Sequence, residues 1–143
     1  ESRRFKKIAV VDAVKLFDRF NMKKELEANE KAKLQAISKQ VDSIANQLEL
    51  ARASRNEDEV KKMTYGYNYM KTNLENEFRQ GNRDINEQVW KRLNPVVEEY
   101  GKMKGLHVII GANGMGSVLY NDEYLDLTED IIKYVNNKYE AGN

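Results

Sequence analysis

Apolar residues recur along this chain with three different periods, which divide it into segments. A short apolar run at residues 8–11 is closed by Asp12 and predicts a buried strand. A brief helix should follow, with its apolar positions at Val14, Leu16, Phe17 and Phe20. From about Met22 onward the spacing becomes that of long helices.

The first long segment carries apolar residues at alternating spacings of three and four, the heptad pattern of a coiled coil. This seam consists of Leu34, Ile37, Val41, Ile44, Leu48 and Ala51. It stops at residues 53–58, where Ser, Asn and Asp favour turns and helix starts. A second seam then runs through Val60, Met63, Tyr67, Met70 and Leu74, and continues less regularly through Phe78, Ile85, Val89, Leu93, Val96 and Tyr100.

The two seams mirror each other about a centre between Arg55 and Asn56. The facing pairs are Ala51 with Val60, Leu48 with Met63, Ile44 with Tyr67, Val41 with Met70 and Ile37 with Leu74. Unrelated helices have no reason to share a common centre. The pattern therefore predicts an antiparallel helical hairpin with arms of about 30 residues, roughly 45 to 50 Å long.

The returning helix changes character after the regular heptads. Phe78, Val89 and Tyr100 are eleven residues apart, a period that unwinds a left-handed supercoil. Gly81 weakens the helix by about 1 kcal/mol relative to Ala, and Pro95 removes one helical hydrogen bond. We therefore expect the arms to splay or straighten here, and the helix to kink or restart at Pro95.

The last third of the chain predicts strands and a final helix. Residues 107–110 and 117–120 have strand patterns and flank the glycine-rich residues 111–116, which predicts a β-hairpin. Asp126 or Thr128 can cap the last helix. Its apolar face consists of Ile131, Ile132, Val135 and Tyr139.

The order of elements places the chain in the α+β class. We expect a small body of strands and short helices, formed by residues 1–21 and 95–143, in which strands from the two ends of the chain come together. Residues 22–94 should form the helical arm, with its tip near residues 54–59.

Composition supports elongated helices over a dense globule, because charged residues make up 33% of the chain and Pro occurs once. The 24 basic and 23 acidic residues leave a net charge of +1, which argues against binding to nucleic acid. No apolar stretch approaches the ~20 residues that span a bilayer, so we expect no stable membrane insertion. The basic start with Arg3, Arg4, Lys6 and Lys7 leads into a run broken by Asp12, so a signal peptide, if the protein is exported, has been removed.

The sequence offers little support for a catalytic site or a cofactor-binding site. Gly111, Gly114 and Gly116 lack the spacing of a phosphate loop and precede a predicted strand where a helix is required. His107 is the single histidine and the chain has no cysteine, so the usual metal sites and catalytic triads lack partners. We expect no enzyme activity and no cofactor.

Two tyrosines stand apart from the hairpin seam. Tyr67 belongs to the seam, whereas Tyr65 and Tyr69 lie four residues apart on another face of the same helix. They should form an exposed aromatic ridge, which either contacts a bound protein or lies against a neighbouring arm or solvent.

Several short sequence motifs, and their order around the predicted hairpin, resemble those of the Skp/OmpH family of periplasmic chaperones. The motifs are Lys7-Ile8-Ala9-Val10-Val11-Asp12 with Leu16-Phe17, the section from Leu106 to Asn113 followed by Val118-Leu119-Tyr120, and Asp126-Leu127-Thr128-Glu129-Asp130-Ile131-Ile132. The resemblance covers nearly the whole chain. It departs from the family's basic character, so no residues are assigned to anionic lipid or lipopolysaccharide binding.

The resemblance implies a homotrimer that holds unfolded outer-membrane β-barrel proteins in the periplasm without ATP. Strands from the subunits would associate into a shared body, with candidate residues Ile8, Val10, Val11, Val108, Ile109, Ile110, Val118 and Leu119. Tyr65 and Tyr69 are the candidate client-binding residues. The alternative is a coiled-coil adaptor or structural subunit of a cell-envelope complex, which the sequence leaves open.

Overall fold

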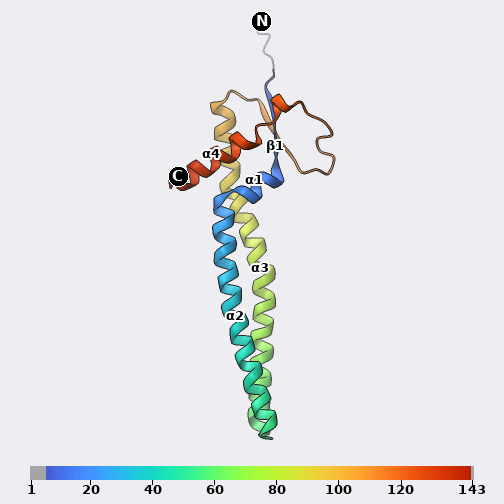
Figure 1. The fold of residues 1–143 in the computed structure, drawn as a ribbon, viewed down its shortest axis with the longest axis vertical. Helices are drawn as coiled ribbons and strands as arrows, with labels where there is room; N and C mark the ends of the chain where they lie inside the picture. The colour runs from blue at the N-terminus through green and yellow to red at the C-terminus, as the bar shows by residue number, and fades with distance from the viewer. Residues whose placement is uncertain (1–5, 143) are drawn as a thin grey trace. The chain divides into compact units, whose positions relative to one another are not determined.

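The computed structural model describes residues 6–142, so Arg3 and Arg4 of the basic start lie outside the described residues. The elements in chain order are β1 (Ile8–Asp12), α1 (Ala13–Arg19), α2 (Asn21–Ala53), α3 (Glu57–Met103), β2 (Val108–Ala112), the short 3-10 helix η1 (Glu123–Leu125) and α4 (Thr128–Glu140) (Figure 1). The chain divides into two compact units. We name them the hairpin unit, residues 26–85, and the mixed unit, described for residues 6–25 and 86–142.

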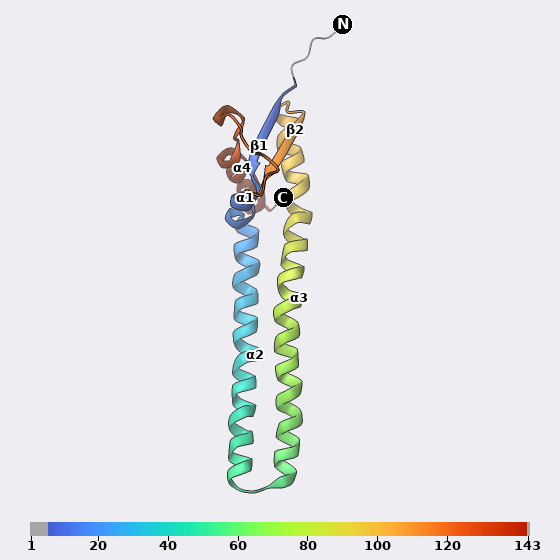
Figure 2. The ribbon, with the colours of Figure 1, turned by 90° about the vertical axis from the view of Figure 1, so that its right-hand side faces the viewer.

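The hairpin unit confirms the predicted antiparallel pair of helices (Figure 2). The turn occupies residues 54–56, where Arg55 adopts a left-handed φ of 55°. Asn56 then starts α3, because its Oδ1 accepts a hydrogen bond of 3.2 Å from the backbone N–H of Glu59. Acidic residues in the first turn of α3 suit the positive end of the helix dipole.

Burial in the hairpin unit is limited to a narrow line between the two helices. The buried apolar residues are Val41, Leu48, Ala51 and Ile85. The other members of the two seams in this unit are half-buried, apart from Phe78, which is 60% exposed. A heptad stripe this narrow holds two helices together but forms no globular core.

The mixed unit contains a two-stranded parallel sheet built from the two ends of the chain (Figure 2). β1 pairs with β2 in a register that places Ile8 beside Val108 and Asp12 beside Ala112. The other edge of β1 is partly covered, because the N–H of Leu127 donates a hydrogen bond of 2.9 Å to the carbonyl of Val10. The prediction that the end strands meet is therefore confirmed.

Large side chains fill the core of the mixed unit. The bulkiest fully buried residues are Phe20, Leu16, Leu93, Ile131, Val89 and Val135. Phe17 stacks on Trp90 with ring centroids 5.2 Å apart, and Phe20 meets Tyr139 edge-on at 5.7 Å. Residues from α1, α3 and α4 thus pack together around Phe20.

Side chains of α4 satisfy backbone groups where the first elements join. At the corner between α1 and α2, Asn136 accepts a 2.7 Å hydrogen bond from the N–H of Asn21 and donates one of 3.0 Å to the carbonyl of Arg19. The hydroxyl of Thr128 accepts a 2.8 Å bond from the N–H of Asp12. Two of these contacts, to the N–H groups of Asn21 and Asp12, are partly buried, where an unpaired backbone group would be costly.

Two expectations are wrong. Residues 117–120 form no strand, and β2 pairs with β1 instead of with a hairpin partner. The glycine-rich segment is a loop closed on itself, because Asn113 Oδ1 accepts hydrogen bonds from the Met115 N–H and the Ser117 hydroxyl. The expected restart at Pro95 is also wrong, because α3 runs without a break from Glu57 to Met103, whereas the expected kink stays a prediction. Pro95 and Lys91, whose carbonyl loses its donor, are both exposed, so solvent can reach that carbonyl.

Candidate functional site

The predicted aromatic ridge lies on the outside of α3 within the hairpin unit. Tyr65 is 76% exposed and Tyr69 is 59% exposed. Tyr67, between them in sequence, is half-buried in the seam, with Lys71 Nζ lying 5.9 Å from its ring centroid. The seam and the ridge therefore occupy different faces of the helix, as the spacing predicts.

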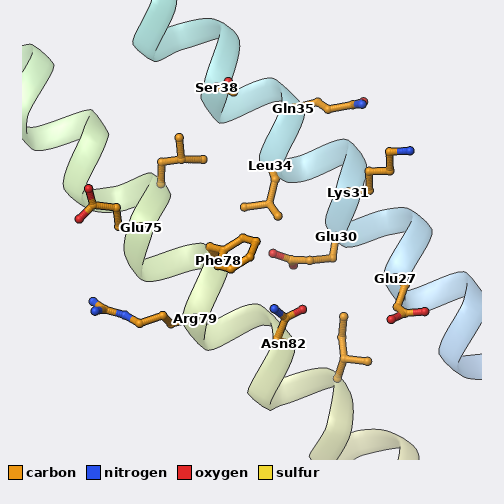
Figure 3. Close-up of a pocket in the computed structure, with 12 residues that line it drawn as sticks. Glu27, Glu30, Lys31, Leu34, Gln35, Ser38, Glu75, Phe78, Arg79 and Asn82 are labelled. Carbon is orange, nitrogen blue, oxygen red and sulfur yellow. The ribbon is translucent and has the colours of Figure 1, made fainter. Parts of the chain in front are cut away.

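The hairpin unit also contains a groove between α2 and α3, with a volume of about 850 Å³ (Figure 3). Its apolar lining is formed by Leu34, Leu74, Phe78 and Ile85. Figure 3 shows the side chains of Glu30 and Phe78 pointing toward one another across it, whereas Lys31 and Arg79 point away. The groove thus presents apolar walls and an inward-facing carboxyl group.

Gly81 makes room for that carboxyl group. A methyl group at position 81 would lie only 2.5 Å from Cδ of Glu30 and 2.9 Å from its Oε1. Within the described residues, Glu30 Oε2 is buried and has no hydrogen-bond donor. Desolvation, and next the nearby carboxylate of Glu77, raise the pKa of Glu30 above its ordinary value.

The pKa of Glu77 is shifted in the opposite direction. Its Oε1 lies 3.1 Å from Lys33 Nζ. This partner lowers the pKa of Glu77, and Glu77 in turn raises the pKa of Lys33. The pKa values of two neighbouring carboxyl groups therefore shift in opposite directions: Lys33 lowers that of Glu77, whereas burial and the hydrogen bond with Glu77 raise that of Glu30 more than Lys33 lowers it.

The residues proposed for a shared β-body fall into two sets. Val10 and Val11 are buried inside the chain's own mixed unit. Ile109 is half-buried near Gly101, whereas Ile8, Val108 and Ile110 are exposed. Val118 is half-buried and Leu119 is 92% exposed, both in the irregular segment after β2.

An exposed apolar surface accompanies β2 in the mixed unit. Its large exposed members are Val108, Ile110, Met115, Leu119, Tyr120 and Tyr124. In the described chain β2 is hydrogen-bonded to β1 on one side only, so its second edge keeps free backbone groups. An unpaired strand edge beside exposed apolar side chains is a typical protein-association surface.

The described part of the chain shows neither a metal-binding cluster nor a membrane-spanning helix. Residues 6–142 contain no cluster of three or more histidine, aspartate or glutamate side chains that could hold a metal ion. Among the described helices, none combines the length and the apolar character that crossing a membrane requires.

The groove is the feature that sequence reasoning missed. Gly81 and the eleven-residue spacing from Phe78 predict that the helices loosen here, but neither identifies Glu30 as an inward-facing residue. Glu30 lies four residues before Leu34, where the heptad seam would continue, but its charge hides that position from a search for apolar residues. The mirror relation that pairs Ile37 with Leu74 also pairs position 30 with Gly81, so it could have identified this contact, which the structure shows.

The fold defines a mostly helical protein with a long helical hairpin and a small two-stranded sheet. The family model for outer membrane proteins of the OmpH-like type matches residues 7–135, so the chain belongs to the OmpH-like family. Among solved structures, the chain is similar to a candidate outer membrane chaperone (OmpH-like) from Caulobacter crescentus CB15, with a TM-score of 0.55 and 10% identity over 96% of this chain and 88% of that one. At this identity the likeness concerns the fold. No curated protein sequence matches the chain significantly.

Proposed function

We propose that this protein is an ATP-independent holdase that keeps unfolded outer-membrane β-barrel proteins soluble in the periplasm. Membership in the OmpH-like family and the fold of the Caulobacter chaperone candidate support this function. The observation that carries it is the exposed pair Tyr65 and Tyr69, on a hairpin whose seam residues already face each other. Tyrosine offers a large amphipathic contact at low entropic cost and remains tolerable in water.

The working assembly is a homotrimer joined through the mixed units, whose hairpins enclose the client. The free edge of β2 and the exposed apolar side chains beside it support this assembly, because a second copy would pair the edge and bury the surface. Val10 and Val11 contribute indirectly, by holding β1 in place. Many weak contacts from several arms then give useful affinity without fixed geometry.

The test is whether the purified protein suppresses aggregation of a denatured β-barrel protein at stoichiometric ratio. Tyr65→Ser combined with Tyr69→Ser should weaken client retention while leaving helix content and solution mass unchanged. Met70→Ser is the contrasting variant, because Met70 belongs to the seam and its loss should loosen the hairpin first.

Failure to protect several such clients would contradict the holdase and favour an adaptor of an envelope complex. Full protection by the double tyrosine variant would be consistent with the holdase function but would show that Tyr65 and Tyr69 are not needed to bind the client. The solution mass decides the assembly: we expect three times 16.6 kDa, and a monomer would remove the enclosed space.

A further inference from the structure

The single histidine of the chain lies where the pairing between β1 and β2 begins. The two strands are paired from Ile8 onward. One residue earlier, the N–H of His107 donates a 2.8 Å hydrogen bond to the carbonyl of Lys7. The chain turns just before this point, because Gly105 adopts a left-handed φ of 68°. The regular ladder therefore does not continue beyond Lys7.

The ring of His107 gives the last N–H of this ladder a partner. Its Nδ1 accepts a hydrogen bond of 2.7 Å from the backbone N–H of Lys7. His107 thus holds Lys7 twice, once through its backbone N–H and once through its ring. A ring nitrogen accepts a hydrogen bond only while it carries no proton, so this geometry requires a neutral ring with its proton on Nε2.

We propose that His107 is a pH-dependent contact, which holds the start of β1 through its ring only while that ring is neutral. A proton on Nδ1 would make this atom a donor and set it against the N–H of Lys7. Proton uptake and loss of the hydrogen bond are therefore coupled. Histidine is the side chain that ordinarily changes charge between pH 5 and 8, so the contact is closed at pH 8 and open at pH 5.

The charged groups around the ring are of kinds that keep their charge over this range. His107 shares the lining of a cavity of about 440 Å³ with Glu98 and Lys102 of α3. Glu98 Oε1 and Lys102 Nζ lie 4.0 Å apart, so their charges partly offset each other. On the side of β1, Lys7 meets the ring with its backbone N–H. Carboxylates and ammonium groups ordinarily titrate outside pH 5 to 8, so a response within this range reports on the imidazole.

The response should be local. His107 is exposed, so its ring can take up a proton without unfolding of the mixed unit. The following residues of β1, 9–11, are buried in the core of that unit. At the far end of β1, the N–H of Asp12 is held by the hydroxyl of Thr128. Protonation therefore frees the segment at Lys7, while the rest of β1 stays in place. This inference goes beyond the proposed function, because it involves no client.

The experiment is NMR spectroscopy of the ¹⁵N-labelled protein at pH 8 and at pH 5. At pH 8, the ring shifts should place the proton on Nε2, and a ¹⁵N–¹⁵N coupling across the hydrogen bond should join Nδ1 of His107 to the amide of Lys7. At pH 5 the coupling should disappear. Protection of the Lys7 amide, corrected for intrinsic exchange, should fall about fivefold, the loss typical of one hydrogen bond.

Two variants identify the group that responds. His107→Gln removes the imidazole, so protection of the Lys7 amide should no longer differ between pH 8 and pH 5. Glu98→Gln is the matched control, because it removes the carboxylate that lines the same cavity and leaves the imidazole in place. This variant should keep the fall seen in the wild-type protein.

A proton on Nδ1 at pH 8 would overturn the inference, as would equal protection of the Lys7 amide at the two pH values. A fall that survives in His107→Gln would also overturn it. The same holds for a fall at pH 5 that extends equally to the amides of Val10 and Ile131, because both residues lie in the core and such a fall would indicate acid unfolding of the whole mixed unit.

Discussion

The mixed unit and the hairpin unit use similar residues in opposite ways. In the mixed unit, large side chains such as Phe20 and Leu93 are fully buried. In the hairpin unit, the buried line consists of four residues, and most of the seam remains half-buried. Apolar burial supplies most of the stabilising free energy. The mixed unit should therefore resist unfolding, whereas the hairpin unit should open locally and change conformation more easily.

The polar groups of the two units differ less than their cores. In the mixed unit, Thr128 donates both its hydroxyl and its N–H to Asp126, which lowers the pKa of that carboxyl. Glu99 lies 2.7 Å from Lys138 Nζ, and its pKa is also lowered. In the hairpin unit the buried oxygen of Glu30 is unsatisfied and the pKa of Glu30 is raised. Among the described residues, each unit also has a buried polar atom without a hydrogen-bond partner, Arg92 Nη2 in the mixed unit and Glu30 Oε2 in the hairpin unit.

The largest contrast should come from truncating the two cores. Phe20→Ala should lower the free energy of unfolding of the mixed unit by about 3 to 5 kcal/mol, because it empties a fully buried site. Leu48→Ala in the hairpin unit should cost about 2 kcal/mol, at the low end for leucine, because a narrow seam can collapse around the gap. Amide exchange measured for each segment would give the loss of unfolding free energy in each unit. Equal losses in the two variants would contradict the proposed difference between the units.

Assembly should respond to the exposed face of β2 more than to the buried face of β1. Val108→Lys with Ile110→Lys should leave the fold intact and convert the proposed trimer to monomer, because lysines on a free strand edge oppose pairing. Solution mass and circular dichroism together measure this. Asn137→Lys, on an exposed position of α4, is the matched control and should remain trimeric. Trimers that persist in the double lysine variant would place the interface elsewhere.

A smaller effect is expected at the hairpin turn. Arg55 adopts a left-handed φ of 55°, which disfavours every residue with a Cβ except in special settings. Arg55→Gly should stabilise the hairpin unit by about 0.5 to 1 kcal/mol after the entropy of glycine in the unfolded chain is included. Arg52→Gly, in the last turn of α2, should have the opposite sign. The check is thermal unfolding of both variants, and destabilisation by Arg55→Gly would contradict the turn geometry.

The smallest effect concerns the pH dependence of the hairpin. Folding raises the pKa of Glu30, so the ionised group weakens the folded state at neutral pH, and this penalty disappears as pH falls through the raised pKa. Glu30→Gln should therefore raise the melting temperature at pH 7 and make little difference near pH 4. Glu77→Gln should act in the opposite direction at pH 7, because folding lowers the pKa of Glu77. Identical pH profiles for the two variants would contradict the assignment.

The sequence predicted the hairpin well because its evidence is periodic and redundant. Many positions agree on one centre, so a single irregular residue such as Phe78 cannot disturb it. The third predicted strand, at residues 117–120, is wrong, because three apolar residues at 118–120 fit an irregular segment as well as a strand. Pairing between β1 and β2 joins residues about one hundred positions apart, and no local pattern specifies that it is parallel.

The site was predictable only in part, for a related reason. Exposure of Tyr65 and Tyr69 follows from helix geometry, once the seam is known. The inward orientation of Glu30 depends on the absence of a side chain at Gly81, on the opposite helix. Positions 30 and 81 continue the two seams and their mirror relation, but a glutamate and a glycine at those positions do not register in a pattern of apolar residues.

Amide hydrogen exchange of the full-length protein, with and without a denatured β-barrel client, tests the central claim most directly. The account predicts that the free protein exchanges fastest around residues 54–59 and slowest in β1 and the core helices of the mixed unit. The client should then slow exchange within residues 26–85 and leave the mixed unit unchanged. Client protection confined to the mixed unit, or uniformly slow exchange along the free hairpin, would contradict a rigid unit that presents an adaptable client-binding arm.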